Sequence, residues 1–267
     1  MTAGFAGSYT FLCVAQGATV ALPGRPLALT RLRSRWWALV PLASIVLVIV
    51  AIRAASGVAD GLTYLALVTT PPLAAVTLAW TGRRHRPLAA LVVVPLFALA
   101  WGERNALVGE ASAVILTALG CATLGVLLAA LAPARWLKLG VIAMSIADTV
   151  LVVVDLLQSP NQRLNAAHPA LGLPQFQRAA FGDAVMGYGD IFLAAVLGAI
   201  LVFEHRRRDP IAVLTTVLAL AFGLLFFFVN ELPATVPVAV ALVVAELRDR
   251  RGAARSPAPA LRAGAPP

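Results

Sequence analysis

The chain has 267 residues and a formal net charge of +9; 60% of its residues are hydrophobic and only 12% are charged. Soluble domains carry about 25% charged residues, so this composition excludes a soluble domain and indicates an integral membrane protein. The basic residues lie in short clusters between apolar runs, which argues against a nucleic-acid partner and favours a role in membrane orientation.

Apolar runs follow one another along the chain, each near the length of about 20 residues that a helix needs to cross a bilayer. A weakly apolar run comes first and clearer ones follow it: 3–22, 36–52, 61–80, 87–101, 111–131, 135–157, 184–203, 211–229 and 233–247. The sequence therefore predicts an all-α, polytopic transmembrane helix bundle of about nine spans, forming one domain over residues 1–247. Residues 248–267 are rich in Pro, Ala and Arg and are expected to form a disordered basic tail.

Loop charges differ between the two sides of the predicted bundle. All but four of the 21 lysines and arginines fall in one alternate set of loops and in the tail; the exceptions are Arg53, Arg104, Arg163 and Arg178. Cytoplasmic loops are enriched in Lys and Arg, so the C-terminus is expected in the cytoplasm and, with nine spans, the N-terminus outside. If 3–22 does not span, only the N-terminus changes sides. The excess of arginine over lysine suggests a GC-rich genome and a bacterial cell membrane.

Three aspartates lie inside apolar runs, where an ionisable side chain is costly and indicates function. Asp148 is near the middle of its run, Asp155 is near the outer end of the same run, and Asp190 is in the first turns of the next. Two carboxyl groups held together in a low-dielectric site share one proton. One of them can then activate a water molecule while the other protonates a carbonyl oxygen. Asp148 and Asp190 are the expected pair, and Asp155 is an accessory candidate.

Two glycines, Gly187 and Gly189, directly precede Asp190. They weaken the start of the helix and would let an unwound substrate backbone approach. Glycine spacing is also typical of close helix packing in membranes, and by itself it favours that interpretation. No cluster of His, Cys and Asp has metal-ligand spacing and no phosphate-binding loop is recognisable, so we expect neither metal nor cofactor.

Three short motifs together resemble the GxGD intramembrane aspartyl proteases, the family of presenilin and signal peptide peptidase. The stretch GYGD at 187–190 matches the GxGD motif, Ala147-Asp148 falls where the family has Tyr-Asp, and Pro233-Ala234-Thr235 falls where it has Pro-Ala-Leu. The match in order and spacing covers roughly residues 135–247, whereas the spans of 1–131 match only in number. Ala147 and Thr235 depart from the family pattern, which puts full activity in doubt.

This resemblance implies a catalytic half at 135–247 that cleaves peptide bonds of transmembrane helices or signal peptides. Its catalytic residues would be Asp148 and Asp190, and its substrate-binding or supporting residues would be Gly187, Tyr188, Gly189, Pro233, Ala234 and Thr235. The loop charges match the orientation of signal peptide peptidase, which implies single-span substrates in the type II sense or remnant signal peptides. Its other partner would be the lipid bilayer.

Two other interpretations stay open from the sequence. A prepilin-peptidase-like aspartyl protease also carries GxGD with a preceding aspartate, although such enzymes act at the cytoplasmic face. A proton or cation transporter, a channel or an inactive membrane scaffold would use the aspartates for ion passage, and the spacing of Asp148 and Asp155 puts both on one helix face. The loop 158–183 joins the two aspartate-bearing spans and is either a binding element or a polar linker.

Overall fold

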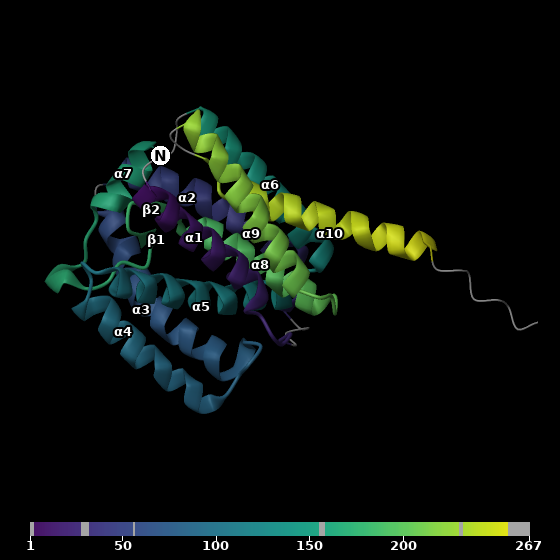
Figure 1. Ribbon diagram of the computed structural model, residues 1–267, viewed down its shortest axis with the longest axis horizontal. Coiled ribbons are helices and arrows are strands. Elements are labelled where there is room, and N and C mark those ends of the chain that lie inside the picture. The colour runs from purple at the N-terminus through teal and green to yellow at the C-terminus, as the bar shows by residue number, and fades with distance from the viewer. Residues whose placement is uncertain (1–2, 28–31, 56, 155–157, 230–231, 256–267) are drawn as a thin grey trace, which may run out of the picture.

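A computed structural model describes residues 3–27, 32–55, 57–154, 158–229 and 232–255 (Figure 1). The helices are α1 (Ala3–Ala21), α2 (Val40–Ala54), α3 (Val58–Val76), α4 (Val93–Gly102), α5 (Leu107–Leu131), α6 (Ala134–Val153), α7 (Gln158–Ala166), α8 (Tyr188–Phe203), α9 (Asp209–Gly223) and α10 (Val236–Arg255). Short 3-10 or π helices extend several of them: η2 (Arg35–Leu39), η3 (Thr77–Thr81), η4 (Pro87–Val92) and η6 (Leu224–Phe227). The 3-10 helix η5 (Ala170–Gly172) stands alone between α7 and the segment that follows. The predicted helical bundle is confirmed.

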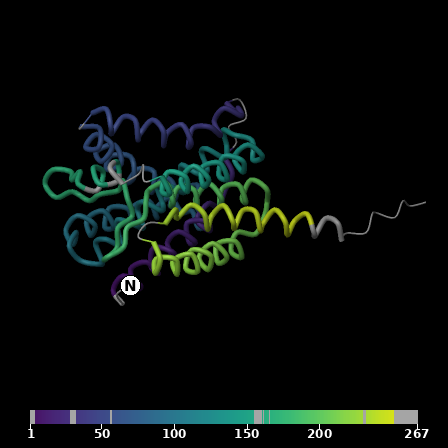
Figure 2. The backbone as a smooth tube through the Cα atoms, turned by 90° about the horizontal axis from the view of Figure 1, so that it is seen from above, coloured from purple at the N-terminus to yellow at the C-terminus, as the bar shows by residue number. Residues whose placement is uncertain are grey.

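Within the described residues, five helices are long and apolar enough to cross a membrane. They cover Arg35–Ala54, Val58–Thr81, Leu107–Leu131, Ala134–Val153 and Asp209–Phe227. Pro87–Gly102 and Tyr188–Phe203 are shorter apolar helices. The chain is therefore compatible with an integral membrane protein, and the count of nine spans stays a prediction. Helix α10 runs to Arg255, so the first part of the expected tail continues the helix, and its end projects beyond the other helices (Figures 1 and 2).

Helix α8 forms the centre of the bundle. Ile191 and all residues from Leu193 to Val202 are buried, and Phe192 is partly buried. A helix that is apolar on every side is expected in such a position, because no face of it gains from contact with water. Helices α1, α5, α6 and α10 pack around it. The site residues carried by α8 are thus held by a rigid, fully packed element.

Small residues bring α8 very close to two of its neighbours. A Cβ atom on Gly198 would lie 2.2 Å from the carbonyl oxygen of Val20 in α1. A Cβ atom on Gly125 in α5 would lie 2.7 Å from the carbonyl carbon of Ala195. Both contacts are with backbone, which cannot move aside easily. The helices therefore pack at the close separation that small residues allow in membrane proteins.

Gly198→Val is expected to lower the unfolding temperature of the detergent-solubilised protein, because the new side chain must push α1 away from α8. Overpacking of this kind costs about 1–3 kcal/mol or more. The matched control is Gly61→Val in α3, where a Cβ atom meets nothing within 4 Å. Equal shifts in unfolding temperature for the two variants would contradict the close α1–α8 contact.

A β-hairpin precedes α8 and was not predicted. Strand β1 (Arg178–Phe181) pairs antiparallel with β2 (Ala184–Gly187), and Arg178 lies opposite Gly187. Gly182 in the turn has a left-handed φ of +54°, a conformation that glycine adopts without strain. The expected span therefore begins as a strand at residue 184, and its helix begins only at Tyr188. The loop 158–183 is likewise structured, with α7, η5 and β1.

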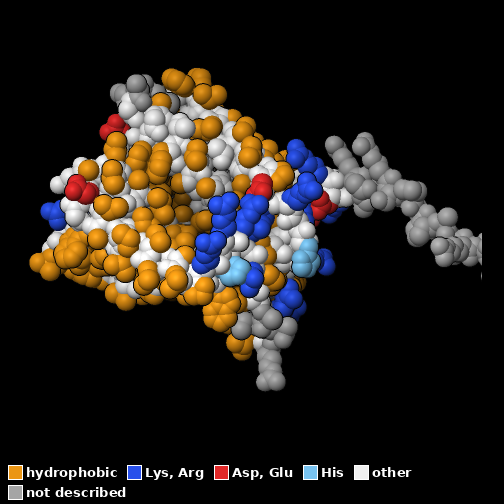
Figure 3. All heavy atoms as spheres, turned by 60° about the horizontal axis from the view of Figure 1, so that its bottom comes forward, with side chains coloured by type: hydrophobic (Ala, Val, Ile, Leu, Met, Phe, Trp, Pro, Cys, Tyr) orange, Lys and Arg blue, Asp and Glu red, His pale blue; other side chains and the backbone are white. Residues whose placement is uncertain are grey.

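The basic loops predicted to share one side of the membrane meet at one end of the bundle. Arg83 forms an ion pair with Asp209, and Lys138 forms one with Glu204. Figure 3 shows blue Lys and Arg side chains gathered beside an almost continuous apolar surface. At the other end, Arg163 donates a hydrogen bond to the carbonyl oxygen of Ile52 at 2.6 Å.

Candidate functional site

The two predicted catalytic carboxylates lie near one another. Asp190 is in the first turn of α8, and Asp148 lies in α6, five residues before its last residue, Val153. Their side chains are close enough to interact electrostatically. Met144, one turn before Asp148, also reaches α8: its Cε atom lies 3.6 Å from the place where Gly189 would carry a Cβ atom. Packing of α6 on α8 thus brings the aspartates together.

Helix capping explains why Asp190 follows Gly-Tyr-Gly. The backbone N–H of Gly187, the residue that caps α8, donates a hydrogen bond to Oδ2 of Asp190 at 3.0 Å. A carboxylate in the first turn also interacts favourably with the positive end of the helix dipole. A Cβ atom on Gly187 would lie only 3.1 Å from the same oxygen. This local geometry fixes one carboxylate oxygen of Asp190 against the backbone.

Thr235 makes the direct contact with the other aspartate. Its hydroxyl group donates a hydrogen bond to Oδ2 of Asp148 at 2.7 Å, and the threonine is 2% exposed. Thr235 lies just before α10, after the buried Pro233. It is one of the two residues that depart from the family pattern. In this chain the departure supplies a hydrogen-bond donor to Asp148.

Gln16 of α1 belongs to the site and was not singled out from the sequence. Its Nε2 atom donates hydrogen bonds to the carbonyl oxygen of Ala234 at 2.8 Å and to that of Asp190 at 3.4 Å. The side chain is fully buried, and within the described part of the chain its Oε1 atom has no hydrogen-bond partner. It links the segment before α10 to the first turn of α8. A buried amide in the middle of an apolar run was the signal that could have identified it.

Two other predicted site residues, Tyr188 and Ala234, make different contacts. Tyr188 packs with α5 in an apolar cluster, and its hydroxyl group interacts with the thiol of Cys121. Ala234 contributes its carbonyl oxygen through the bond to Gln16. Asp155, the accessory candidate, lies outside the described residues.

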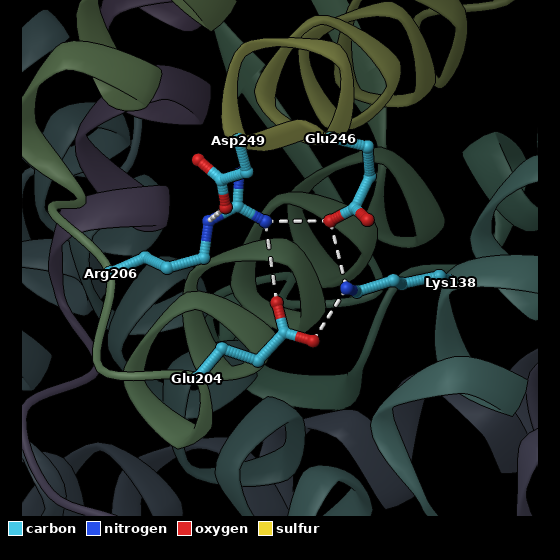
Figure 4. A network of polar contacts seen from close by, with 5 residues as sticks. All are labelled: Lys138, Glu204, Arg206, Glu246 and Asp249. Carbon is cyan, nitrogen blue, oxygen red and sulfur yellow. Dashed lines mark hydrogen bonds and ion pairs between the residues drawn. The ribbon is translucent and has the colours of Figure 1, made fainter. Parts of the chain in front are cut away.

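A network of ion pairs joins the same helices at the opposite end of the bundle (Figure 4). Lys138 of α6 contacts Glu204 at 2.5 Å and Glu246 of α10 at 2.8 Å. Arg206 contacts Glu246 at 2.6 Å, Glu204 at 3.3 Å and Asp249 at 2.7 Å. Glu204 directly follows α8, so the network ties together the three segments that carry Asp148, Asp190 and Thr235. Shared partners of this kind fix helix ends more firmly than isolated surface pairs.

The site residues offer carboxylate, hydroxyl and amide chemistry. Among the described residues no group of His, Cys, Asp and Glu side chains is arranged to hold a metal ion. Comparisons with protein-family models, with curated protein sequences and with solved structures find no match for this chain.

Proposed function

We propose that the protein is an intramembrane aspartyl protease of the GxGD type, with Asp148 and Asp190 as its catalytic pair. The observation that carries the proposal is the meeting of two carboxylates from successive apolar helices. An ionisable residue in a membrane helix is costly, and two of them close enough to interact electrostatically cost more still unless they share a proton. Aspartyl proteolysis uses such a pair.

In the proposed reaction, the ionised member of the pair accepts a proton from a water molecule, whose oxygen attacks the carbonyl carbon of a substrate peptide bond. The protonated member gives its proton to the carbonyl oxygen, which produces a tetrahedral diol. Transfer of a proton to the amide nitrogen then breaks the C–N bond and releases a carboxylic acid and an amine. The pair acts as a unit, so neither role is assigned to one residue.

The hairpin suggests how a substrate would lie. Strand β2 ends at Gly187, whose N–H contacts Asp190, and β2 pairs with β1 along one edge. An unwound substrate segment could pair with the other edge and so extend toward the carboxylates. From the excess of Lys and Arg in the loops we expect the C-terminus in the cytoplasm and therefore the hairpin end outside. Single-span helices in the type II sense and remnant signal peptides are the proposed substrates.

Cleavage of a defined single-span substrate tests the proposal. The full chain is reconstituted in liposomes with a reporter helix inserted in either orientation, and the products are mapped by mass spectrometry. We expect cleavage within the reporter's membrane segment, faster for the type II orientation, and inhibition by a hydroxyl-containing peptide that mimics the tetrahedral diol. Absence of cleavage, or cleavage insensitive to this inhibitor, would contradict an aspartyl mechanism.

A further inference from the structure

A basic cavity of about 490 Å³ opens at the end of the bundle opposite the hairpin. Its walls come from the loop after η3 and from the loop between α8 and α9. The lining residues include four arginines, Arg83, Arg206, Arg207 and Arg208, together with His205, Asp209 and Pro210. With a single carboxylate against four guanidinium groups, the cavity carries a strong positive charge.

The four arginines differ in whether they are bound by acidic side chains. Arg206 is held by the acidic residues of the ion-pair network, and Arg83 pairs with Asp209 through both of its terminal nitrogens. Within the described part of the chain, Arg207 has no ion pair, and Nη1 of Arg208 is buried without a hydrogen-bond partner. Burial and the neighbouring charge of Arg83 lower the pKa of Arg208. Neither Arg207 nor Arg208 is thus held in an ion pair, although the Asp209 carboxylate that Arg83 binds lies near enough to Arg208 to interact with its charge.

Both walls are fixed before any ligand arrives. In the α8–α9 loop, the N–H of Arg206 donates to the carbonyl oxygen of Leu201 at 2.8 Å, and His205 holds a left-handed φ of +55°. In the other loop, the N–H of Arg83 donates to the carbonyl oxygen of Leu22 at 3.1 Å. Helix α9 begins at the cavity, and its first N–H groups add partial positive charge there. A preformed site of this kind loses little freedom on binding.

The cavity lies where apolar helices end. The helix Val58–Thr81 ends just before Arg83, α8 ends at Phe203, and the candidate span Asp209–Phe227 begins at the cavity. The ends of membrane-spanning helices lie near the depth of the lipid phosphates in a bilayer. On the surface seen in Figure 3, blue side chains directly adjoin the apolar face that acyl chains would cover.

We propose that this cavity binds the phosphate group of an anionic membrane lipid. The planar guanidinium fork pairs with two phosphate oxygens at once, and basic pockets between membrane helices hold anionic head groups. Arg207 and Arg208 supply the free positive charge. The exposed Arg83–Asp209 pair contributes little stability, so the phosphate can displace the Asp209 carboxylate and recruit Arg83. This site does not depend on proteolysis.

Binding to the detergent-solubilised full chain tests the proposal. The ligands are dioctanoyl phosphatidylglycerol, dioctanoyl phosphatidylcholine and inorganic phosphate, each titrated while the unfolding temperature is recorded. We expect saturable stabilisation by the phosphatidylglycerol alone. The double variant Arg207→Gln/Arg208→Gln should weaken its apparent affinity by about tenfold or more. Inorganic phosphate that stabilises the protein at the same concentrations would overturn the assignment to a lipid.

Two further variants make the result specific to the cavity. Arg248→Gln/Arg250→Gln removes the same charge from exposed positions of α10 outside the cavity lining, and should leave the affinity unchanged. Asp209→Asn should strengthen binding, because it removes the competing carboxylate and releases Arg83; this holds even if the arginine variant does not fold. An equal loss in both arginine pairs, or no gain from Asp209→Asn, would overturn the proposal.

Discussion

Asp148→Asn or Asp190→Asn is expected to abolish cleavage of a single-span substrate in liposomes, with a loss on the order of 10⁴-fold. Asparagine keeps the shape of the side chain but can neither take the proton from water nor return it. At position 190 the amide oxygen can still accept the hydrogen bond from Gly187, so the start of α8 should be preserved. Residues that act as one unit show non-additive losses, so the double variant should be no slower than either single one.

Asp155→Asn is the matched control, because it removes a carboxylate of the same predicted span without touching the proposed pair. Asp155→Asn should keep most of the cleavage rate. Cleavage rates should be compared only among variants whose unfolding temperatures equal that of the original chain. If Asp155→Asn abolishes cleavage and Asp148→Asn does not, then the assignment of the pair is wrong. If all three variants cleave as well as the original chain, the activity does not come from these aspartates.

Thr235→Val is expected to lower kcat about tenfold or more with little change in KM. The substitution keeps the volume of a 2% exposed side chain but removes the only hydroxyl donor recorded for Asp148 within the described residues. Loss of one hydrogen bond to a charged group is worth about 1.5–3 kcal/mol, which corresponds to roughly 10- to 100-fold in rate if the bond is made in the transition state.

Thr235→Ser separates positioning from packing. Serine retains the hydroxyl group and loses only a methyl group, so it should recover most of the rate lost in Thr235→Val. A variant with leucine, the residue of the family motif, should resemble valine, because no side-chain donor would then contact Asp148. If serine and valine slow the reaction equally while both proteins remain folded, the hydroxyl group does not support the pair.

The pairing of Asp148 and Asp190 could be anticipated because a charge inside an apolar run stands out at once. The role of Thr235 could not: a sequence comparison shows only that the family residue is missing, and the hydrogen bond spans 87 positions. Gln16 lies still further from its partner Ala234 along the chain, at a separation of 218 residues. Such contacts depend on how the helices pack, and no local pattern encodes that.

The hairpin was missed for a different reason. Residues 184–187 are apolar enough to look like the first turn of the span that follows, and four residues are too few for hydrophobic periodicity to separate strand from helix. Gly182 and Asp183 form the turn of the hairpin, but in the sequence they are indistinguishable from the end of the polar loop 158–183. Tyr188 was placed at the site by its neighbours in the motif, whereas the start of α8 turns its side chain toward Cys121.

The ion-pair network around Lys138 and Arg206 holds one end of three helices together, so this end is the pivot about which these helices can tilt. Ten residues separate Lys138 from Asp148, so the carboxylate lies about 15 Å along the helix axis from this pivot. A tilt of about 5° at the pivot would move Asp148 by roughly 1.3 Å, enough to open or close a contact between two carboxyl groups. Because the salt bridges hold the other end, the spacing of Asp148 and Asp190 would be most sensitive to forces that act on the hairpin end.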